Sequence, residues 1–411
     1  MNILYFGKVC EENVFKEKEK KQQPFFVAQY MYEKALCDEF IKNKNIDLEI
    51  VSIYQTEYFP KDIMFFNKRS KEGYKVKLKY LKFINLPYLR ELSYFISTCF
   101  CILNWWARNR EEKNNKCIYS SCHFPPVSLA IVIMGKVLSI KKIVTFTDLS
   151  LFTFSSERIN KMKAYKKVLM TPYVGLVNKL QKSYDGYILF SKTMNDVVNP
   201  YNKPYCVVEG MYNGGQLNFD TKAVKQHAIA HAGTLNEEVG IKKILDVFDL
   251  IEDQEVELYL IGKGDMTKEI ENRSKTNKSI KYLGFMPKGE VFEYLKSAKL
   301  LVNLRNPSDI YTRYSFPSKI FEYMVSGTPV LTTKLEGIPK EYYDYLYTVN
   351  SYDSEVIKDK IIEIITKSED ELFEFGIKAR EFVLKEKNSK KQSEKIVAMI
   401  NNLLKLSPSS F

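Results

Sequence analysis

The feature that most constrains the fold is an alternation of short strand-like segments with helical patterns through residues 226–333. The strand-like segments are mainly apolar and are bounded by turn-forming residues: Ala228–Ala232, Glu257–Ile261, Ile280–Leu283, Leu300–Asn303 and Pro329–Thr332. Between them, Ile241–Leu250, Lys288–Ala298 and Pro317–Ser326 carry apolar residues at helical spacing. This alternation predicts a Rossmann-like α/β domain built on a parallel sheet.

The first half of the chain repeats this rhythm more weakly. Strands are expected at Asn2–Val9, Asp47–Tyr54, Lys116–Ser120, Lys142–Phe146 and Gly186–Phe190, a helix at Phe25–Lys42, and an exposed, mobile loop at the polar stretch Glu11–Gln23. At 411 residues the chain is too long for one ordinary core. We therefore expect domains at 1–205 and 226–385, a hinge at 206–225, and a final helix at 386–411 that can cross back to the first domain.

The charge of the chain calls for an anionic partner. Its formal net charge is +12 and its pI is near 9.0, which fits nucleic acid, anionic lipid or a phosphorylated small molecule. The basic segment 158–182 and the apolar segment 86–106 together indicate a peripheral membrane dock, with a buried core helix as the alternative for 86–106. No base-reading motif accompanies the charge, so nucleic acid is disfavoured.

Cysteine usage and the start of the chain favour the cytoplasm. The seven cysteines form no CxxC and no spacing typical of metal ligands, so neither a disulfide framework nor a metal is expected. Met1–Val9 lacks the basic start of a signal peptide, and the longest apolar stretch, Leu92–Ala107, is too short to span a bilayer. We expect a cytoplasmic protein, peripheral on the inner face of the cell membrane.

The window Tyr314–Thr333 carries the strongest chemical signal. Pro317 suits the first turn of a helix, with Ser315 or the residues just before it as the cap, and the free N–H groups of that turn form an anion site. Lys319 adds a positive charge that suits a phosphate, and Ser318 lies beside it. Glu322, one turn later, can accept hydrogen bonds from the two hydroxyls of a ribose. An ordinary surface helix is the alternative.

This window, PSKIFEYMVSGTPV, resembles the nucleotide-binding helix and following strand of glycosyltransferase family 4. The similarity extends to AHAGTLNEEVGIKKILDVF, LYLIGKGD and IKYLGFMPKGEVFEYLKSAKLLVNLR, in the order that the family has them, and is dense over residues 184–345. It implies the GT-B fold, in which two Rossmann-like domains face each other across a cleft. It also implies transfer of a hexose-type sugar from a nucleotide sugar, a UDP-sugar by preference, with retention of anomeric configuration and without a metal or other cofactor.

The resemblance assigns the site residue by residue. Gly233 and Thr234 approach the diphosphate, Gly7 plays the matching part in the first domain, with a plain turn as its alternative, and Gly262 ends a strand of the second. Phe285 lies where members hold the base, and Ser318, Lys319 and Glu322 begin the nucleotide-binding helix. Many members also have a glutamate where this chain has Tyr314, and basic residues at the places of Thr234 and Val239. Lys319 and then Arg305 are therefore expected to neutralise the phosphates.

The acceptor side is expected in the first domain. His123 and Asp148 each follow a strand there, and Asp148 resembles a position that flanks the transferred sugar in relatives; each has a structural role as its alternative. The resemblance and the basic surface imply a lipid-linked saccharide acceptor in bacterial surface polysaccharide synthesis. A nucleotide-sugar epimerase of the same fold, and a non-catalytic subunit that binds sugar nucleotides, remain open.

Overall fold

The computed structural model describes residues 1–20, 27–68, 77–112, 115–121, 123–149, 164–213, 225–251 and 255–405. Within these residues the chain divides into two compact units. Unit 1 comprises Met1–Phe190, Met194–Asn213 and Ser389–Phe411, and unit 2 comprises Ser191–Thr193 and Gly214–Asn388. Each unit is a parallel sheet covered by helices, so the prediction of an α/β fold with two Rossmann-like domains is confirmed.

Unit 1 is built on a seven-stranded sheet of order β4-β2-β1-β6-β7-β8-β9. Its strands are β1 (Asn2–Gly7), β2 (Asp47–Ser52), β4 (Lys77–Tyr80), β6 (Lys116–Ser120), β7 (Lys141–Phe146), β8 (Gly186–Leu189) and β9 (Tyr205–Val207), with the short pair β3 (Phe65–Phe66) and β5 (Phe83–Ile84) outside it. Its helices are α1 (Glu12–Lys20), α2 (Val27–Lys42), α3 (Leu89–Arg108), α4 (Pro125–Val137), α7 (Ala164–Gln181), α8 (Met194–Val198) and α16 (Ser389–Lys405). All neighbouring strands of the large sheet are parallel, in the register Asn2 with Asp47 and Asn2 with Lys116 around β1.

Unit 2 has a six-stranded parallel sheet of order β12-β11-β10-β13-β14-β15. Its strands are β10 (Gln226–Thr234), β11 (Glu257–Lys263), β12 (Ile280–Gly284), β13 (Ala298–Asn303), β14 (Val330–Thr333) and β15 (Tyr347–Val349). Its helices are α9 (Ile241–Phe248), α10 (Thr267–Thr276), α11 (Lys288–Ser297), α12 (Ile310–Tyr314), α13 (Lys319–Ser326), α14 (Ser354–Ile365) and α15 (Glu369–Glu386), with 3₁₀ turns at η1 (Glu237–Val239) and η2 (Lys340–Tyr345). Numbered along the chain, this is the 3-2-1-4-5-6 order of a dinucleotide-binding sheet.

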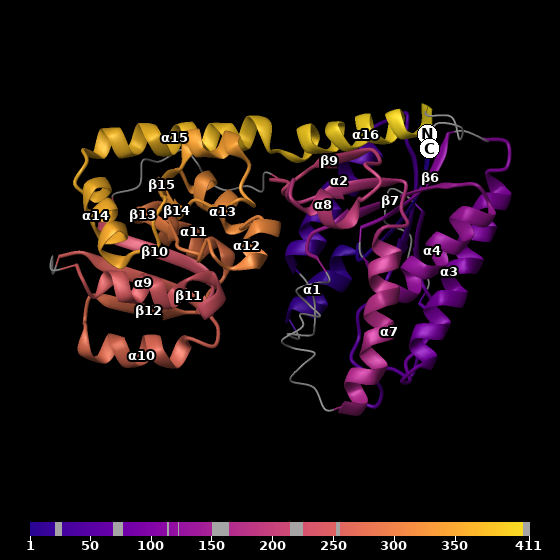
Figure 1. Ribbon diagram of the computed structural model, residues 1–411, viewed down its shortest axis with the longest axis horizontal. Coiled ribbons are helices and arrows are strands. Elements are labelled where there is room, and N and C mark those ends of the chain that lie inside the picture. Colours follow the sequence, from indigo (N-terminus) through magenta and orange to yellow (C-terminus); the bar gives the residue numbers. More distant parts are fainter. Residues whose placement is uncertain are drawn as a thin grey trace. The chain divides into compact units, whose positions relative to one another are not determined.

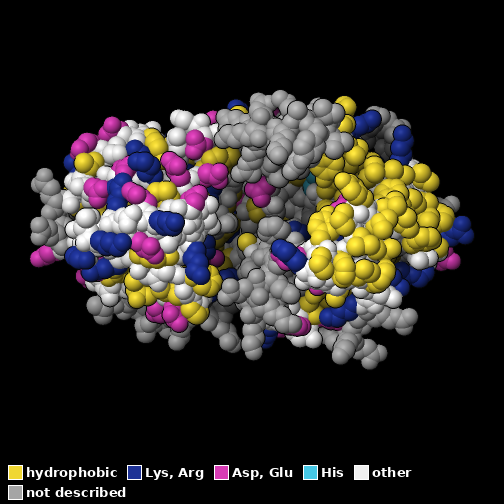
Figure 2. Space-filling model, turned by 90° about the horizontal axis from the view of Figure 1, so that it is seen from below, with side chains coloured by type: hydrophobic (Ala, Val, Ile, Leu, Met, Phe, Trp, Pro, Cys, Tyr) yellow, Lys and Arg dark blue, Asp and Glu magenta, His cyan; other side chains and the backbone are white. Residues whose placement is uncertain are grey.

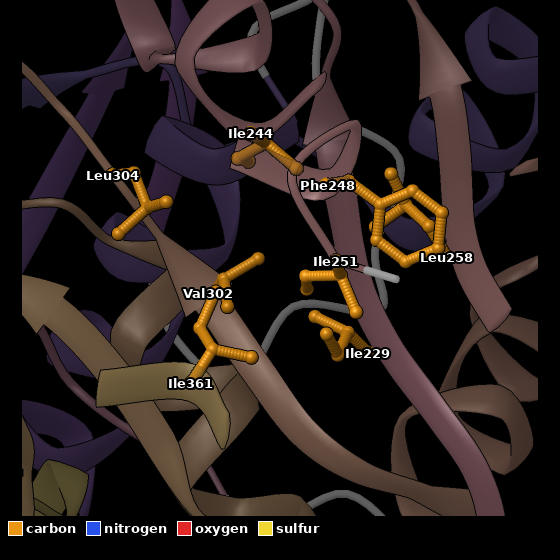
Figure 3. A pocket seen from close by; sticks show the side chains of 8 residues that line it. All are labelled: Ile229, Ile244, Phe248, Ile251, Leu258, Val302, Leu304 and Ile361. Carbon is orange, nitrogen blue, oxygen red and sulfur yellow. The ribbon is translucent and has the colours of Figure 1, made fainter. Parts of the chain in front are cut away.

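The core of unit 2 lies between this sheet and the pair α9 and α14. Figure 3 shows part of it, where eight hydrocarbon side chains surround a small gap: Ile229, Ile244, Phe248, Ile251, Leu258, Val302, Leu304 and Ile361. These side chains are apolar because parallel strands are covered on both faces and must exclude water. The gap offers no polar group to a sugar or phosphate, so it is part of the packing and not a ligand site.

The last two long helices belong to different units. α15 packs on α13 in unit 2, whereas α16 packs on α2, β8 and β9 in unit 1. Ser389, the first residue of α16, donates its backbone N–H to the carbonyl of Tyr212, and its hydroxyl bonds Glu39 on α2. The chain therefore returns to unit 1 after completing unit 2 (Figure 1).

One local expectation is wrong. Glu11–Gln23 is not a loop where it is described, because residues 12–20 form α1. Glu12 pairs with Lys16 one turn later at 2.8 Å, Val14 is buried, and the ring of Phe15 stacks on Tyr30 of α2. A charged sequence thus forms a helix because two apolar side chains on one face find a partner, which overrides the polar composition.

Candidate functional site

The switch point of the unit 2 sheet lies between β10 and β13, where the chain order reverses. In open α/β sheets ligands bind beside the carboxyl ends of the strands at such a point. Gly233 and the exposed Thr234 end β10, and Arg305 follows β13 by two residues. The backbone of Arg305 is held in place because Thr333 donates its hydroxyl to the Arg305 carbonyl at 2.6 Å. The structure thus brings three predicted site residues to one edge of one sheet.

The start of α13 covers this edge. The helix begins at Lys319, two residues later than expected, with Ser318 and not Ser315 at the cap position; no described side chain caps it. Lys319 donates from Nζ to Glu322 Oε2 at 2.7 Å, and both side chains are partly exposed. A Cβ built on Gly233 would lie 3.2 Å from Lys319 Cε, so the lysine stem runs across the glycine that ends β10. Gly233 has a φ of 148°, which favours glycine.

Tyr323 fixes α13 against β10. Its buried hydroxyl donates to the Ala232 carbonyl at 2.9 Å and accepts the Ala232 N–H at 2.8 Å. Beside it, buried His231 bonds the Val302 carbonyl through Nδ1. Burial is the main cause that lowers the pKa of His231 to about 4, and the charges of Lys319 and Arg305 contribute to this lowering. Lys319 and Arg305 therefore both lie close enough to His231 to act on its charge.

The ends of β11 and β12 extend the same edge. Gly262 has a φ of 136°, and a Cβ there would lie 1.8 Å from the Gly233 carbonyl oxygen, so the two strand ends touch through backbone alone. Asn236 accepts the N–H of Asp265 and ties the two turns together. After β12, the ring of Phe285 is 74% exposed, and the Lys263 ammonium lies 5.5 Å from its centre. An exposed aromatic ring at this place is suited to stacking on a nucleobase.

Three predicted residues lie at the corresponding edge of unit 1. Gly7 ends β1, and His123 and Asp148 follow the adjacent strands β6 and β7. Burial lowers the pKa of His123 to about 4, so its ring is neutral at physiological pH, and its Nδ1 lies 3.3 Å from the hydroxyl of Ser128. Asp148 is exposed and accepts a hydrogen bond from Thr147 at 3.4 Å. The exposed carboxylate of Asp148 can bond a sugar hydroxyl, whereas Nε2 of His123 is buried in the structure.

Sequence reasoning missed a fourth group at this edge, formed by Lys8, Gln29 and Glu33. Lys8 follows Gly7, while Gln29 and Glu33 are one turn apart on α2. The available signal was the spacing of four residues on the helix that follows β1. It is weak because charged residues at such spacing usually lie on a solvated helix face.

The expected membrane segment 86–106 is neither wholly buried nor wholly exposed. α3 buries Tyr94, Thr98, Ile102 and Trp105. Large apolar side chains elsewhere on the helix are exposed, namely Leu89, Leu92, Ile96, Phe100 and Leu103, as is Tyr88 just before it. Exposed apolar residues on α4 (Ile133 and Val137) and α7 (Tyr173 and Leu176) accompany them, and these helices pack side by side. Figure 2 shows the resulting broad hydrophobic area, which we call the apolar face.

The basic segment 158–182 is described only in part. Residues 158–163 lie outside the described residues, as do the side chains of Lys166 and Lys167. Lys179 and Lys182, at the end of α7 and just after it, are exposed. Among the described helices, each is too short or too polar to cross a bilayer. The described residues also contain no group of three or more His, Cys, Asp or Glu arranged to hold a metal ion.

Comparison with known proteins agrees with this geometry. Residues 217–382 match the family of glycosyl transferases group 1. No curated protein matches the sequence. Among solved structures, HepE from Anabaena, solved in complex with UDP, is similar at a TM-score of 0.63, with 13% identity over 98% of this chain and 100% of HepE.

Two further structures show the same similarity over nearly the whole chain. Sucrose-phosphate synthase from Thermosynechococcus elongatus has a TM-score of 0.59 and 13% identity, over 99% of this chain and 100% of its own. WaaG, a glycosyltransferase involved in lipopolysaccharide biosynthesis, has a TM-score of 0.59 and 11% identity, over 97% and 99%. At these identities the similarity concerns the fold, so the chain has the GT-B fold, and its segment 217–382 carries the match to group 1 glycosyl transferases.

Proposed function

We propose that the chain is a retaining glycosyltransferase, which moves a hexose from a UDP-sugar to a lipid-linked saccharide. The observation that carries the proposal is the convergence of Gly233, Arg305, Lys319 and Glu322 at the switch point of the unit 2 sheet. Two cations beside a glycine turn suit a diphosphate, and a carboxylate one turn into the helix suits a ribose. The match of residues 217–382 and the UDP bound to HepE support this assignment.

The chemistry follows from the charge at this edge. As the bond from the sugar to the diphosphate breaks, negative charge grows on the departing phosphate. Arg305 beside the end of β13, and Lys319 once it has turned to the phosphate, would stabilise that charge, so we propose that transfer needs no metal. Lys319 must turn from Glu322 to the phosphate, which frees Glu322 to accept hydrogen bonds from the ribose.

The site is tested by binding of nucleotide sugars. Thermal unfolding is followed with UDP-, GDP-, dTDP- and CMP-sugars, in the presence of EDTA. We expect a shift with a UDP-sugar, which K319A abolishes and E322A reduces. The matched controls are K360A and E363A, since Lys360 and Glu363 form an equally short pair one turn apart on α14. Equal loss in the α14 variants would refute the site, whereas UDP-sugar binding without UDP release to any acceptor would favour a non-catalytic subunit.

We further propose that the apolar face holds the protein on the inner, anionic surface of the cell membrane, where a lipid-linked acceptor is found. Lys136 on α4, Lys179 at the end of α7 and Lys182 just after it are exposed, whereas the sequences of α3, α4 and α7 hold one acidic residue, Glu91. Glu91 is itself engaged by Arg90 and by the hydroxyl of Tyr58. A surface that combines apolar side chains with an excess of basic residues matches anionic lipid, to which each basic residue contributes about 1 kcal/mol.

Flotation with vesicles tests the apolar face. Leu92 and Phe100 are 53% and 61% exposed. Inserting such side chains gains about 1–2 kcal/mol each, so L92Q and F100Q should each weaken binding to phosphatidylglycerol vesicles about tenfold. V356Q on α14 is the control, because Val356 is 46% exposed outside this face. Unchanged binding in the double variant L92Q/F100Q, or equal binding to neutral vesicles, would contradict a membrane role; self-association lost in that variant would point to a protein partner.

A further inference from the structure

The switch point of the unit 1 sheet is occupied by a buried carboxylate. The order β4-β2-β1-β6 places the reversal between β1 and β6, so a ligand of unit 1 is expected beside Gly7 and Ser121, which end or follow those strands. The side chain of Glu33 reaches this point from α2 and is fully buried. A Cβ on Gly7 would lie 2.3 Å from Glu33 Oε2, so only glycine leaves room for the carboxylate there.

Both oxygens of Glu33 are held by hydrogen bonds. Oε2 accepts the backbone N–H of Lys8, and Oε1 accepts an N–H from the Gln29 amide at 2.8 Å. Gln29 also donates to the Ser121 carbonyl at 3.2 Å, and its own oxygen accepts from the Lys8 ammonium at 2.7 Å. Glu33 therefore fixes the two groups above it, Lys8 and Gln29, which are only partly buried and border solvent.

We infer that Glu33 is a positioning residue for the acceptor: its carboxylate fixes Lys8 and Gln29 so that they meet the hydroxyl groups of a saccharide at the carboxyl ends of β1 and β6. The inference rests on the proposed function, since it assigns a place to that reaction's second substrate. An amide and an ammonium are suited to hydroxyl groups because each hydroxyl both donates and accepts. The neighbouring Asp148, which is exposed, extends the same edge with a further polar group.

Burying a carboxylate costs free energy of folding, so its presence at this place calls for a role. Burial raises the pKa of Glu33 to about 7, and the bonds from Lys8 and Gln29 oppose that rise. The other groups that face it are Tyr5 on β1, Tyr32 and Cys37 on α2, the Ser121 hydroxyl after β6 and the Lys8 ammonium. Burial raises the pKa values of Tyr5, Tyr32 and Cys37, so none of them ionises between pH 6 and 8. Among these groups, Glu33 is therefore the one that titrates over that range.

The experiment separates acceptor use from donor use. Release of UDP from the UDP-sugar is measured without acceptor, as hydrolysis, and with a panel of octyl glycosides, at pH 6, 7 and 8. For the wild type we expect kcat/KM for the glycoside to rise about tenfold from pH 6 to 8 as Glu33 ionises. In E33Q it should be flat with pH and tenfold to a hundredfold lower at pH 8, with hydrolysis and UDP-sugar binding unchanged.

Two further variants make the result specific. Q29A should lower kcat/KM for the glycoside and leave hydrolysis intact, because it removes the amide that links Glu33 to the Lys8 ammonium. D38N is the control, since Asp38 pairs with Lys34 on the same helix at 2.8 Å but faces away from this edge. Retention of the pH dependence in E33Q, or an equal fall of hydrolysis in E33Q, would overturn the inference alone. Failure of the wild type to bind any UDP-sugar would overturn the proposed function and this inference with it.

Discussion

Replacing Glu33 by glutamine should change how the stability of unit 1 depends on pH. The size of this change follows from the pKa of the Glu33 carboxyl alone. The side chain is fully buried, and its pKa rises from 4.5 to about 7 on folding. The folded state thus holds the proton more tightly than the unfolded state does. Between pH 4.5 and 7 the folded chain binds more protons, so stability falls as the pH rises through this window.

The magnitude follows from the two pKa values. Relative to the fully protonated carboxyl, ionisation lowers the free energy of unfolding by about 0.8 kcal/mol at pH 5 and by about 3.3 kcal/mol at pH 8. Glutamine keeps the shape and does not titrate. Any constant effect of the amide cancels in the difference between the two pH values. E33Q should therefore lose about 2.5 kcal/mol less stability than the wild type between pH 5 and pH 8.

Urea unfolding followed by tryptophan fluorescence measures this difference. The chain has two tryptophans, and both, Trp105 and Trp106, lie on α3 of unit 1, so the signal reports on that unit. D38N should follow the wild type at both pH values. A wild-type minus E33Q difference below about 1 kcal/mol would show that Glu33 is ionised at little cost, and the reasoning from burial would then be wrong.

Three predictions concern unit 2, with circular dichroism melts as the measurement. G262A should destabilise the protein by about 3 kcal/mol or more, because the new Cβ would meet backbone atoms at a φ of 136°. G289A should instead stabilise it by about 0.5–1 kcal/mol, because Gly289 lies in a helix and no atom lies within 4 Å of its added Cβ. Similar melting temperatures for the two variants would contradict this prediction. Burial lowers the pKa of His231 to about 4 in the folded state, so the unfolded state binds the proton more tightly. The wild type should therefore lose about 2 kcal/mol of stability as the pH falls to 5, and H231Q should not show this loss. K225M should cost about 2–4 kcal/mol, since the Lys225 ammonium serves three oxygens, and a neutral effect would show that water replaces it.

The sheets could be predicted because buried parallel strands carry a readable pattern. Segments such as Leu300–Asn303 are apolar on both faces, and helical patterns between them require a parallel order. Because the carboxyl ends of parallel strands share one edge, the strand ends alone indicate that Gly233 and Arg305 lie near each other. The helix start at Lys319 differed by two residues, because the cap depends on backbone geometry that composition does not determine.

The apolar face shows why some of the site could not be predicted. In α3 the buried positions Tyr94, Thr98 and Ile102 and the exposed positions Leu92, Ile96 and Phe100 both recur every four residues. Both series are largely apolar, so periodicity alone does not say which one meets the protein and which one meets solvent. That distinction depends on α4 and β5, which pack against α3.

Glu33 could not be predicted because Gln29 and Glu33, four residues apart, look like an ordinary solvated helix face. The position of Glu33 also bears on which unit binds the phosphates. In both units the glycine that ends the first strand is in close contact with a charged side chain: Gly7 with Glu33, and Gly233 with Lys319. At Gly7 the backbone N–H of Lys8, which a phosphate would need, is already used by Glu33. A carboxylate there repels a diphosphate, whereas the lysine over Gly233 attracts one. The two glycines look alike in the sequence, but the charges above them favour the diphosphate in unit 2 and uncharged hydroxyl groups in unit 1.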